Sequence, residues 1–366
     1  MHTVLVLGGY GFFGARICTS LATQPNLRLL VAGRNAQRAR TAARSLGLAA
    51  DQGTAVDARA AGLAGQLRSL GVNTVVHTAG PFQGQSYEVA QAAIAADCNY
   101  IDLADGREFV VGIRSLDAQA RGRGVTVVSG ASSVPALSSA VVDRYRSDYA
   151  RLDTIRVGIS SGARAPGVAT VRGVFSYCGK PVRCWQAGSW TTAYGWLGLT
   201  RHRFPAPVGA RWLGTCNVPD LELFPQRYGA AREVSFQAGF ASTAGHFVVW
   251  SLAHLVKAGL LGSAAVFAAP LHRVSRRIEP LVSGNGGMFV SLAGIGASGG
   301  PLARTWYLIA GHNHGPQIPC APAIALAVKL SRGAQLPAGA LPCMGLLSVE
   351  DILAPLQALD IREVVR

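Results

Sequence analysis

The stretch that decides the fold lies at the N-terminus, where thirteen successive residues read His2-Thr3-Val4-Leu5-Val6-Leu7-Gly8-Gly9-Tyr10-Gly11-Phe12-Phe13-Gly14. The valines and leucines of residues 2–8 are typical of a buried parallel strand, and residues 12–22 are expected to form a helix. A glycine-rich turn between a buried strand and a helix is a setting in which backbone amides receive a phosphate group.

The glycines of this turn satisfy two dinucleotide-binding patterns. Gly8, Gly11 and Gly14 give G-x-x-G-x-x-G, and Gly9, Gly11 and Gly14 give G-x-G-x-x-G. Glycine is needed because a Cβ would hold the backbone away from a pyrophosphate, while the helix N-terminus supplies free N–H donors. We therefore expect the whole loop to bind the cofactor: Gly8, Gly9, Tyr10, Gly11, Phe12, Phe13 and Gly14.

The end of the second expected strand, residues 27–32, predicts which cofactor is bound. A carboxylate there would indicate NAD by bonding the ribose 2′-OH, but the chain continues with Gly33, Arg34 and Asn35. Arginine can stack on adenine and pair with a 2′-phosphate. We expect NADP rather than NAD, with Arg34 and Asn35 in its site. Asp57, after the third strand, is expected either to meet the adenine edge or to cap a helix.

Strand-like and helix-like segments alternate over the first 130 residues. The expected strands are 2–8, 27–32, 53–56, 72–78, 99–103 and 125–129, and the expected helices are 12–22, 35–46, 58–70, 85–96 and 115–122. This alternation with short connections predicts an α/β protein with a doubly wound parallel sheet.

The regular alternation of strands and helices ends at about residue 130. A helix over 138–149 is followed by strand-like runs at 152–160, 181–187, 232–240, 288–295 and 304–310, and helices return at 322–332 and 348–358. We predict a Rossmann domain over 1–130 and a second α+β domain with a mixed or antiparallel sheet over 131–315. Residues 316–366 are expected to form a C-terminal helical segment.

Composition narrows the class of protein. The 366 residues are 49% hydrophobic and 14% charged, with a net charge of +15, and the basic residues are scattered. A chain of this length and hydrophobicity is expected to form two folded domains. Without a basic run or a recognition motif, nucleic acid is not an expected partner. Seven dispersed cysteines without C-x-x-C predict neither disulfides nor a metal site, and an N-terminus without a signal peptide fits the cytoplasm.

One apolar stretch, residues 247–271, is long enough to cross a bilayer. It carries His254 and Lys257 near its middle, which are costly in a spanning helix. We expect a buried or interfacial helix, so that peripheral contact with a membrane stays open. The oligomeric state also stays open between a monomer and a homodimer.

Residues after the fourth and fifth strands are expected at the carboxyl edge of the sheet, where ligands bind in open α/β folds. Small residues and proline after the fourth strand would let the cofactor lie close to the main chain: Ala79, Gly80, Pro81 and Phe82. Asp102 and Asp105, at the end of the fifth strand, are the candidate catalytic residues for acid/base chemistry. A structural hydrogen bond or a cap is the alternative role for each.

Together, Gly80-Pro81-Phe82, Tyr100-Ile101-Asp102 and Gly130-Ala131-Ser132-Ser133-Val134-Pro135-Ala136-Leu137 resemble the saccharopine dehydrogenase family, with a fainter match at Gly315-Pro316-Gln317-Ile318-Pro319. The resemblance implies a Rossmann domain plus a sheet-based substrate domain, with the C-terminal segment 316–366 packing back on the Rossmann domain. It also implies NAD(P) chemistry on amino or imino acids, polyamine precursors or, in some members, lipid enoyl groups. The glycine loop departs from the family's commoner G-x-G-x-x-G and is closer to the short-chain dehydrogenase form. The Tyr-x-x-x-Lys pair of those dehydrogenases is absent.

We therefore expect an NADP-dependent oxidoreductase that transfers hydride to or from a C=N or C=C bond of a small molecule. Aromatic residues within 175–215, with three arginines nearby, either line a pocket for an apolar or carboxylate-bearing substrate or belong to the core. The alternatives are a membrane-associated enzyme similar to lipid enoyl reductases and a non-catalytic NADP-binding redox sensor.

Overall fold

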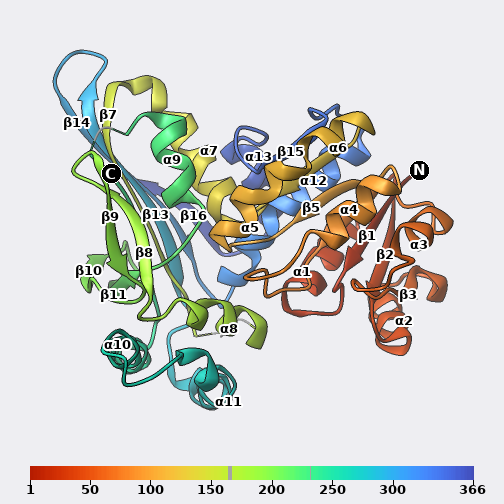
Figure 1. Ribbon diagram of the computed structural model, residues 1–366, viewed down its shortest axis with the longest axis horizontal. Coiled ribbons are helices and arrows are strands. Elements are labelled where there is room, and N and C mark those ends of the chain that lie inside the picture. Colours follow the sequence, from red (N-terminus) through yellow and green to blue (C-terminus); the bar gives the residue numbers. More distant parts are fainter. Residues whose placement is uncertain (164–166, 231) are drawn as a thin grey trace. The chain divides into compact units, whose positions relative to one another are not determined.

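The computed structural model describes residues 1–163, 167–230 and 232–366, which form two compact units (Figure 1). Unit 1 comprises Met1–Leu137 and Gln317–Leu356, and unit 2 comprises Ser138–Pro316 and Gln357–Arg366. The C-terminal segment 316–366 is thus shared: most of it belongs to unit 1, and its last ten residues belong to unit 2.

Unit 1 is built on a seven-stranded sheet in the order β15-β6-β5-β4-β1-β2-β3, and every pairing is parallel. The order reverses between β1 and β4, which is the point where open α/β sheets bind their ligands. The predicted doubly wound parallel sheet is confirmed. Its strands are β1 (His2–Leu7), β2 (Leu27–Gly33), β3 (Gly53–Ala55), β4 (Thr74–His77), β5 (Asn99–Asp102), β6 (Thr126–Ser129) and β15 (Gly339–Pro342).

Helices follow the strands in unit 1: α1 (Phe12–Leu21), α2 (Ala36–Ser45), α3 (Leu63–Ser69), α4 (Glu88–Ala95), α5 (Arg107–Gly112), α6 (Asp117–Gly122), α12 (Ala321–Ser331) and α13 (Val349–Leu353). Two of them begin later than the sequence predicts. The helix expected from residue 58 begins at Leu63, because an Asx turn at Asp57 occupies the preceding residues. The helix expected from residue 85 begins at Glu88, because the Gln85 side chain bonds loop carbonyls instead.

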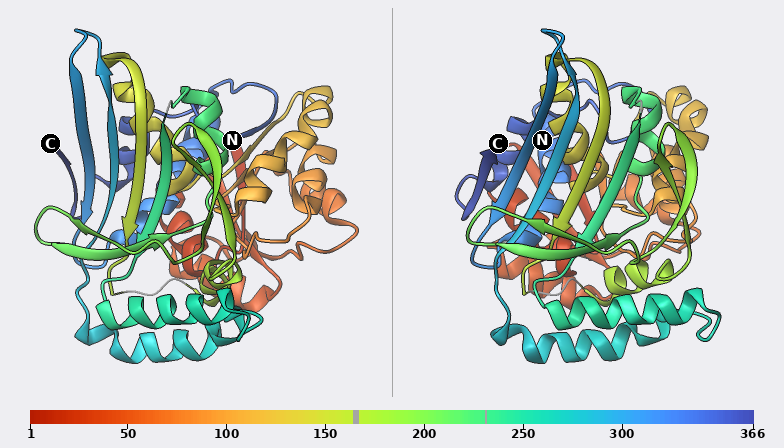
Figure 2. Two further views of the ribbon diagram at one scale, coloured as in Figure 1. Left: turned by 60° about the vertical axis from the view of Figure 1, so that its left-hand side comes forward. Right: turned by 90° about the vertical axis from the view of Figure 1, so that its left-hand side faces the viewer.

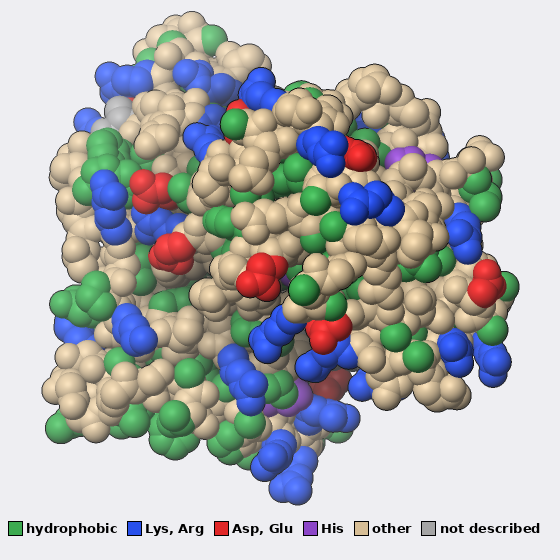
Figure 3. Space-filling view, turned by 45° about the vertical axis from the view of Figure 1, so that its right-hand side comes forward, with side chains coloured by type: hydrophobic (Ala, Val, Ile, Leu, Met, Phe, Trp, Pro, Cys, Tyr) green, Lys and Arg blue, Asp and Glu red, His purple; other side chains and the backbone are tan. Residues whose placement is uncertain are grey.

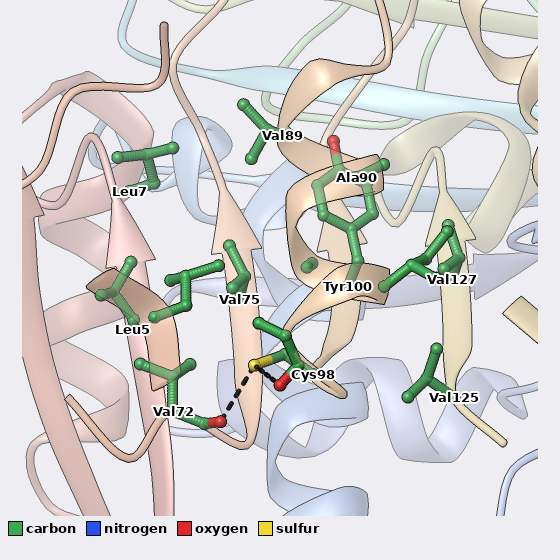
Figure 4. Packing of buried hydrophobic residues seen from close by; sticks show 14 of the residues in the cluster. Leu5, Leu7, Val72, Val75, Val89, Ala90, Cys98, Tyr100, Val125 and Val127 are labelled. Atoms are coloured by element: carbon green, nitrogen blue, oxygen red, sulfur yellow. Dashed lines mark hydrogen bonds between the residues drawn. The ribbon is translucent and has the colours of Figure 1, made fainter. Parts of the chain in front are cut away.

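A hydrophobic core of unit 1 lies between the sheet and its helices (Figure 4). Leu5, Val75, Tyr100 and Val127 contribute from four neighbouring strands, and Ala90 contributes from α4. Because side chains alternate between the faces of a strand, the strand residues of this cluster point to one face. Both faces are covered, since every residue of β1 after His2 is buried.

Unit 2 contains a nine-stranded mixed sheet in the order β10-β11-β12-β7-β13-β14-β16, with β8 and β9 attached beside β12. Among the described strands of this sheet, β7 and β12 pair in parallel and the other pairs are antiparallel. The predicted mixed sheet is therefore confirmed. Its strands are β7 (Tyr149–Ser160), β8 (Pro181–Gln186), β9 (Ser189–Tyr194), β10 (Thr200–Arg203), β11 (Ala210–Thr215), β12 (Glu233–Gly239), β13 (Gly286–Gly296), β14 (Pro301–Ala310) and β16 (Ile361–Val365).

The helices of unit 2 are α7 (Ser138–Tyr145), α8 (Val168–Ser176), α9 (Asp220–Tyr228), α10 (Thr243–Lys257) and α11 (Ala268–Ile278). The apolar stretch 247–271 is therefore not one helix, because α10 ends at Lys257 and Gly259 adopts a positive φ of 75°. A short 3₁₀ turn, Ala264–Phe267, leads into α11. Within the described residues, no helix is both long enough and apolar enough to cross a membrane.

Candidate functional site

In the loop between β1 and α1, Gly8 and Gly14 are packed against the end of β4 and leave no room for a side chain. Gly8 has a φ of +88°, and a Cβ there would lie 2.6 Å from the Thr78 Oγ1. A Cβ on Gly14 would overlap the main-chain oxygen of Gly8 and lie 2.8 Å from the same hydroxyl. These two glycines let the first turn of α1 pack directly on the loop and on the end of β4.

Gly11 differs from these two because its open side faces away from the protein. A Cβ there would have one neighbour within 4 Å, the Gly8 oxygen at 3.0 Å, and its φ of −82° with ψ of −179° is ordinary extended backbone. Gly11 is exposed and caps α1 without a side-chain hydrogen bond, and the first turn of α1 contains no acidic residue. The space beside Gly11 therefore suits an anion that accepts from the first amides of α1.

Thr78 anchors this loop by hydrogen bonds to the end of β1. The sequence alone did not reveal this role. Its main-chain N–H and its Oγ1 both donate to the Leu7 oxygen, at 2.9 Å each. The end of β4 is thereby tied to the end of β1, directly beneath Gly8. A hydroxyl residue between a buried strand and a run of small residues is the only local signal for this role.

The residues after β2 form a second part of the site around the Tyr10 ring. The Asn35 N–H donates to the Tyr10 hydroxyl at 3.0 Å, and a Cβ on Gly33 would lie 2.6 Å from the ring. The Arg38 guanidinium lies over the ring, 4.7 Å from its centroid. Arg34 is exposed directly after the strand. Two arginines therefore lie where a ribose 2′-phosphate is expected, although the sequence argument had singled out only Arg34.

Asn35 and Asp57 make local contacts at the start of their loops. Asn35 caps α2 by accepting from the Arg38 N–H at 2.9 Å. Asp57 is exposed and accepts from the Arg59 N–H at 3.1 Å. These local bonds leave room for a nucleotide beside both residues. Contacts of Asn35 and Asp57 with a cofactor therefore stay predictions.

The loop after β4 is held by a side chain from within it. Gln85 donates from Nε2 to the Ala79 oxygen at 3.0 Å and also to the Pro81 oxygen. Ala79, Gly80 and Pro81 remain partly exposed along this loop, whereas the Phe82 ring is buried against His77 with 5.1 Å between centroids. The main chain at 79–81 is thus the accessible part, and Phe82 supports it from inside.

Asp102 is fully buried at the end of β5 and connects two loops. Its Oδ1 accepts from the Gly130 N–H at 2.8 Å, the Ala104 N–H at 2.9 Å and the Ser129 hydroxyl at 3.0 Å. Its main-chain oxygen accepts from the Ala131 N–H at 2.8 Å. Within the described residues, Oδ2 has no hydrogen-bond partner. These contacts are those of a residue that holds the loops after β5 and β6 together, and its catalytic role stays a prediction.

Burial sets the pKa of both candidate acids. It raises the pKa of Asp102 to about 6, against the opposing effect of the hydrogen bonds from Gly130, Ala104 and Ser129. Burial also raises the pKa of Asp105, whose carboxylate accepts from the Gln83 amide at 3.1 Å. Asp105 is only half-buried, so it is the more accessible of the two carboxyl groups.

A buried histidine and tyrosine adjoin Asp102 and were not predicted from the sequence. His77 is its register partner on β4, and the His77 Nδ1 lies 3.0 Å from the Tyr100 hydroxyl. Burial lowers the pKa of His77 to about 4, so its ring is neutral at pH 7. Three titratable side chains thus lie together at the ends of β4 and β5.

Other candidate features of the sequence fall into structural roles. Trp196 is buried and stacks on Phe240 with 5.0 Å between ring centroids, which is core packing in unit 2. His312 lies 2.7 Å from the Asp360 carboxylate in an exposed loop. Among the residues that the structure describes, no three side chains are grouped as metal ligands. On the face drawn in Figure 3, Lys and Arg side chains are spread among Asp and Glu.

Comparison with known proteins connects this geometry to a family. Residues 4–128 match the family model of the saccharopine dehydrogenase NADP-binding domain. Among curated proteins, no sequence matches the chain significantly. A solved saccharopine dehydrogenase (L-Glu forming) from Saccharomyces cerevisiae superposes with a TM-score of 0.71 over 100% of both chains, at 14% identity. At this identity, the superposition shows a common fold.

Two further solved structures match at a TM-score of 0.49. One is an amine dehydrogenase from Mycobacterium smegmatis, with 12% identity over 96% of this chain and 95% of that chain. The other is a meso-dapdh mutant from Clostridium tetani, with 11% identity over 96% of each chain. The resemblance drawn from the sequence is confirmed by the family model. Residues 4–128 belong to the saccharopine dehydrogenase NADP-binding domain family, and the whole chain shares the fold of the yeast saccharopine dehydrogenase.

Proposed function

We propose that the chain uses NADP and transfers hydride to or from a C=N bond of an amino- or imino-acid-like substrate, with a C=C bond as the second candidate. The observation that carries the cofactor choice is the end of β2, where exposed Arg34 follows the strand and Arg38 lies over Tyr10. A carboxylate at this position would repel a 2′-phosphate, whereas a guanidinium pairs with it.

The residues of unit 1 account for binding in two parts. The amides that begin α1, next to Gly11, would donate to the pyrophosphate, and Arg34 and Arg38 would hold the 2′-phosphate. The glycine loop fits this group because the open side of Gly11 leaves room for it. When bound, the nicotinamide supplies or accepts the hydride.

A proton must accompany hydride transfer to a C=N or C=C bond, and the carboxyl groups after β5 are the candidates for holding it. Asp105 is half-buried and has a raised pKa, so a fraction of it stays protonated at a higher pH than an exposed carboxyl group. Asp102 has a pKa of about 6 but is fully buried. Of the two, Asp105 has the better access to a substrate.

The cofactor proposal is tested by binding. We expect Arg34→Glu to raise the NADPH dissociation constant at least about tenfold, which is about 1.4 kcal/mol, while NADH binding changes less. Arg44→Glu is the matched control, because Arg44 is exposed on the last turn of α2, at the end of that helix far from Arg34. Equal weakening for NADPH and NADH would show that Arg34 does not read the 2′-phosphate.

The substrate proposal is tested by NADPH consumption. Mixtures of an amino acid with a 2-oxo acid or an aldehyde supply C=N bonds, and enoyl thioesters supply activated C=C bonds. We expect NADPH oxidation with members of the first group. The yeast structure named saccharopine dehydrogenase, which shares the fold over its whole length, supports this order. Tight NADPH binding without oxidation by either group would favour the redox sensor.

A further inference from the structure

Large apolar side chains are exposed mainly in one segment of unit 2. Nine such side chains are exposed on the described residues, and two of them, Met1 and Val365, lie at the chain ends. The other seven lie between residues 248 and 281: Val248, Leu255, Leu260, Val266, Phe267, Val274 and Leu281. Exposure reaches 77% at Leu260 and 86% at Leu281. Such a concentration marks an interaction surface, since singly scattered apolar residues are the norm elsewhere.

The exposed residues follow helical spacing. On α10, exposed positions recur at intervals of four and three residues along one stripe that carries no charge: Ala244, Val248, Ser251, Leu255 and Ala258. The opposite side of α10 buries His246, Val249 and Ala253. On α11, Val274 and the arginines are exposed, whereas Ala268 is buried. Both helices therefore bury one side and leave an opposite, partly apolar side in solvent.

The two helices run side by side as a hairpin in both views of Figure 2. The connecting residues 258–263 include Leu260, the second most exposed of the seven apolar side chains. We call the exposed side of this hairpin the α10–α11 face, defined by the seven apolar residues together with Arg273, Arg276 and Arg277.

Basic side chains predominate on this face, and Glu279 is the one acidic residue between Val248 and Leu281. No Asp or Glu occurs anywhere in residues 234–278, whereas Lys257, Arg273, Arg276 and Arg277 are all exposed. Lys257 lies over the Tyr194 ring, 4.2 Å from its centroid. The three arginines make no ion pair with a carboxylate of the described residues, although the chain forms many such pairs elsewhere. The face therefore combines exposed cations with exposed apolar side chains.

We propose that the α10–α11 face docks on the surface of an anionic phospholipid bilayer. Apolar side chains would enter the headgroup region, and the arginines would pair with lipid phosphates. At 15 residues, α10 is too short to span a bilayer, so it would lie along the surface. The net charge of +15 favours approach to an anionic surface. A second copy of the chain fits less well, because a two-fold contact would bring like charges together.

Vesicle flotation tests the proposal. The full chain, loaded with NADPH to show that it is folded, is floated with phosphatidylcholine vesicles and with vesicles that also contain phosphatidylglycerol. We expect it to float only with the anionic vesicles. Most of this binding should be lost at about 1 M salt, where the Debye length falls to about 3 Å.

Two sets of variants separate the α10–α11 face from general charge attraction. The triple variant Arg273→Glu/Arg276→Glu/Arg277→Glu is expected to partition at least about tenfold less. Its control, Arg44→Glu/Arg114→Glu/Arg332→Glu, changes the net charge equally at exposed positions of unit 1 and should lose much less. Leu260→Ser/Leu281→Ser removes two exposed side chains at little cost to folding and should also weaken binding, whereas Val365→Ser should not.

Three results would overturn the proposal. The first is no flotation with anionic vesicles, and the second is an equal loss in both triple variants, which would assign binding to net charge alone. The third is a dimer in light scattering that Leu260→Ser/Leu281→Ser dissociates, since the face would then belong to a second copy.

Discussion

Two glycines of one loop should have separable functions, and alanine at each position tests this. A Cβ on Gly14 would overlap the Gly8 oxygen and approach the Thr78 hydroxyl to 2.8 Å, so α1 must shift away from the loop. Overpacking of this kind costs about 1–3 kcal/mol of stability. A Cβ on Gly11 would have only the Gly8 oxygen within 4 Å, at 3.0 Å, and its backbone angles suit any residue. Gly11→Ala should therefore cost about 1 kcal/mol or less.

Binding should show the opposite order. An oxygen that accepts from the amides of this loop lies about 2.9 Å from their nitrogens, within the space that a Cβ on Gly11 fills. Gly11→Ala should therefore weaken NADPH at least about tenfold, or about 1.4 kcal/mol, and Gly11→Val should abolish binding of NADPH and NADH alike. Urea unfolding followed by circular dichroism measures stability, and calorimetric titration measures affinity. Unchanged NADPH binding in Gly11→Val, or equal destabilisation by alanine at both positions, would refute the reasoning.

Three further predictions concern single side chains. Asp105→Asn is expected to keep NADPH affinity within about threefold and to lower turnover by about 10² or more, whereas unaltered turnover in a folded variant would transfer the role of the acid to Asp102. Thr78→Val removes the hydroxyl bond to the Leu7 oxygen and should cost about 1 kcal/mol in urea unfolding, with weaker NADPH binding, whereas Thr23→Val, an exposed hydroxyl bonded within its own turn, should change neither. Burial raises the pKa of Asp220, the first residue of α9, to about 7, so its charged form destabilises the fold above that pH. The penalty disappears as the pH falls toward 4, and Asp220→Asn should therefore raise Tm relative to the unchanged chain more at pH 8 than at pH 5, whereas a constant difference would contradict it.

The nucleotide-binding half of the fold was predictable because its signals are local. Residues 2–14 carry the strand, the turn and the helix start in one continuous stretch, and Arg34 directly follows its strand. Thr78, His77 and Arg38 were not identified, because their contacts join residues far apart in sequence. The Thr78 hydroxyl bonds Leu7, 71 positions earlier. Such pairings exist only once the sheet has assembled.

Several strands of the sheets had no usable signal in the sequence. β15 is four residues long and contains both Gly339 and Pro342, which disfavour strands. β10 is Thr-Arg-His-Arg, without an apolar residue to reveal alternation. β16 was included in a segment predicted to be helical, although it pairs with β14 through five residues. In each case neighbouring strands supply the stabilisation that the segment itself lacks.

The return of the chain to unit 1 affects how the protein is made on the ribosome. α12 packs against α1 and against β1, β4 and β5, and β15 completes the sheet beside β6. Residues 1–137 emerge first, yet these partners are synthesised only after the whole of Ser138–Pro316. During that interval, the edge of β6 and the site of α12 are uncovered, and unpaired edges invite association between chains. The nucleotide-binding unit is therefore completed only late in translation.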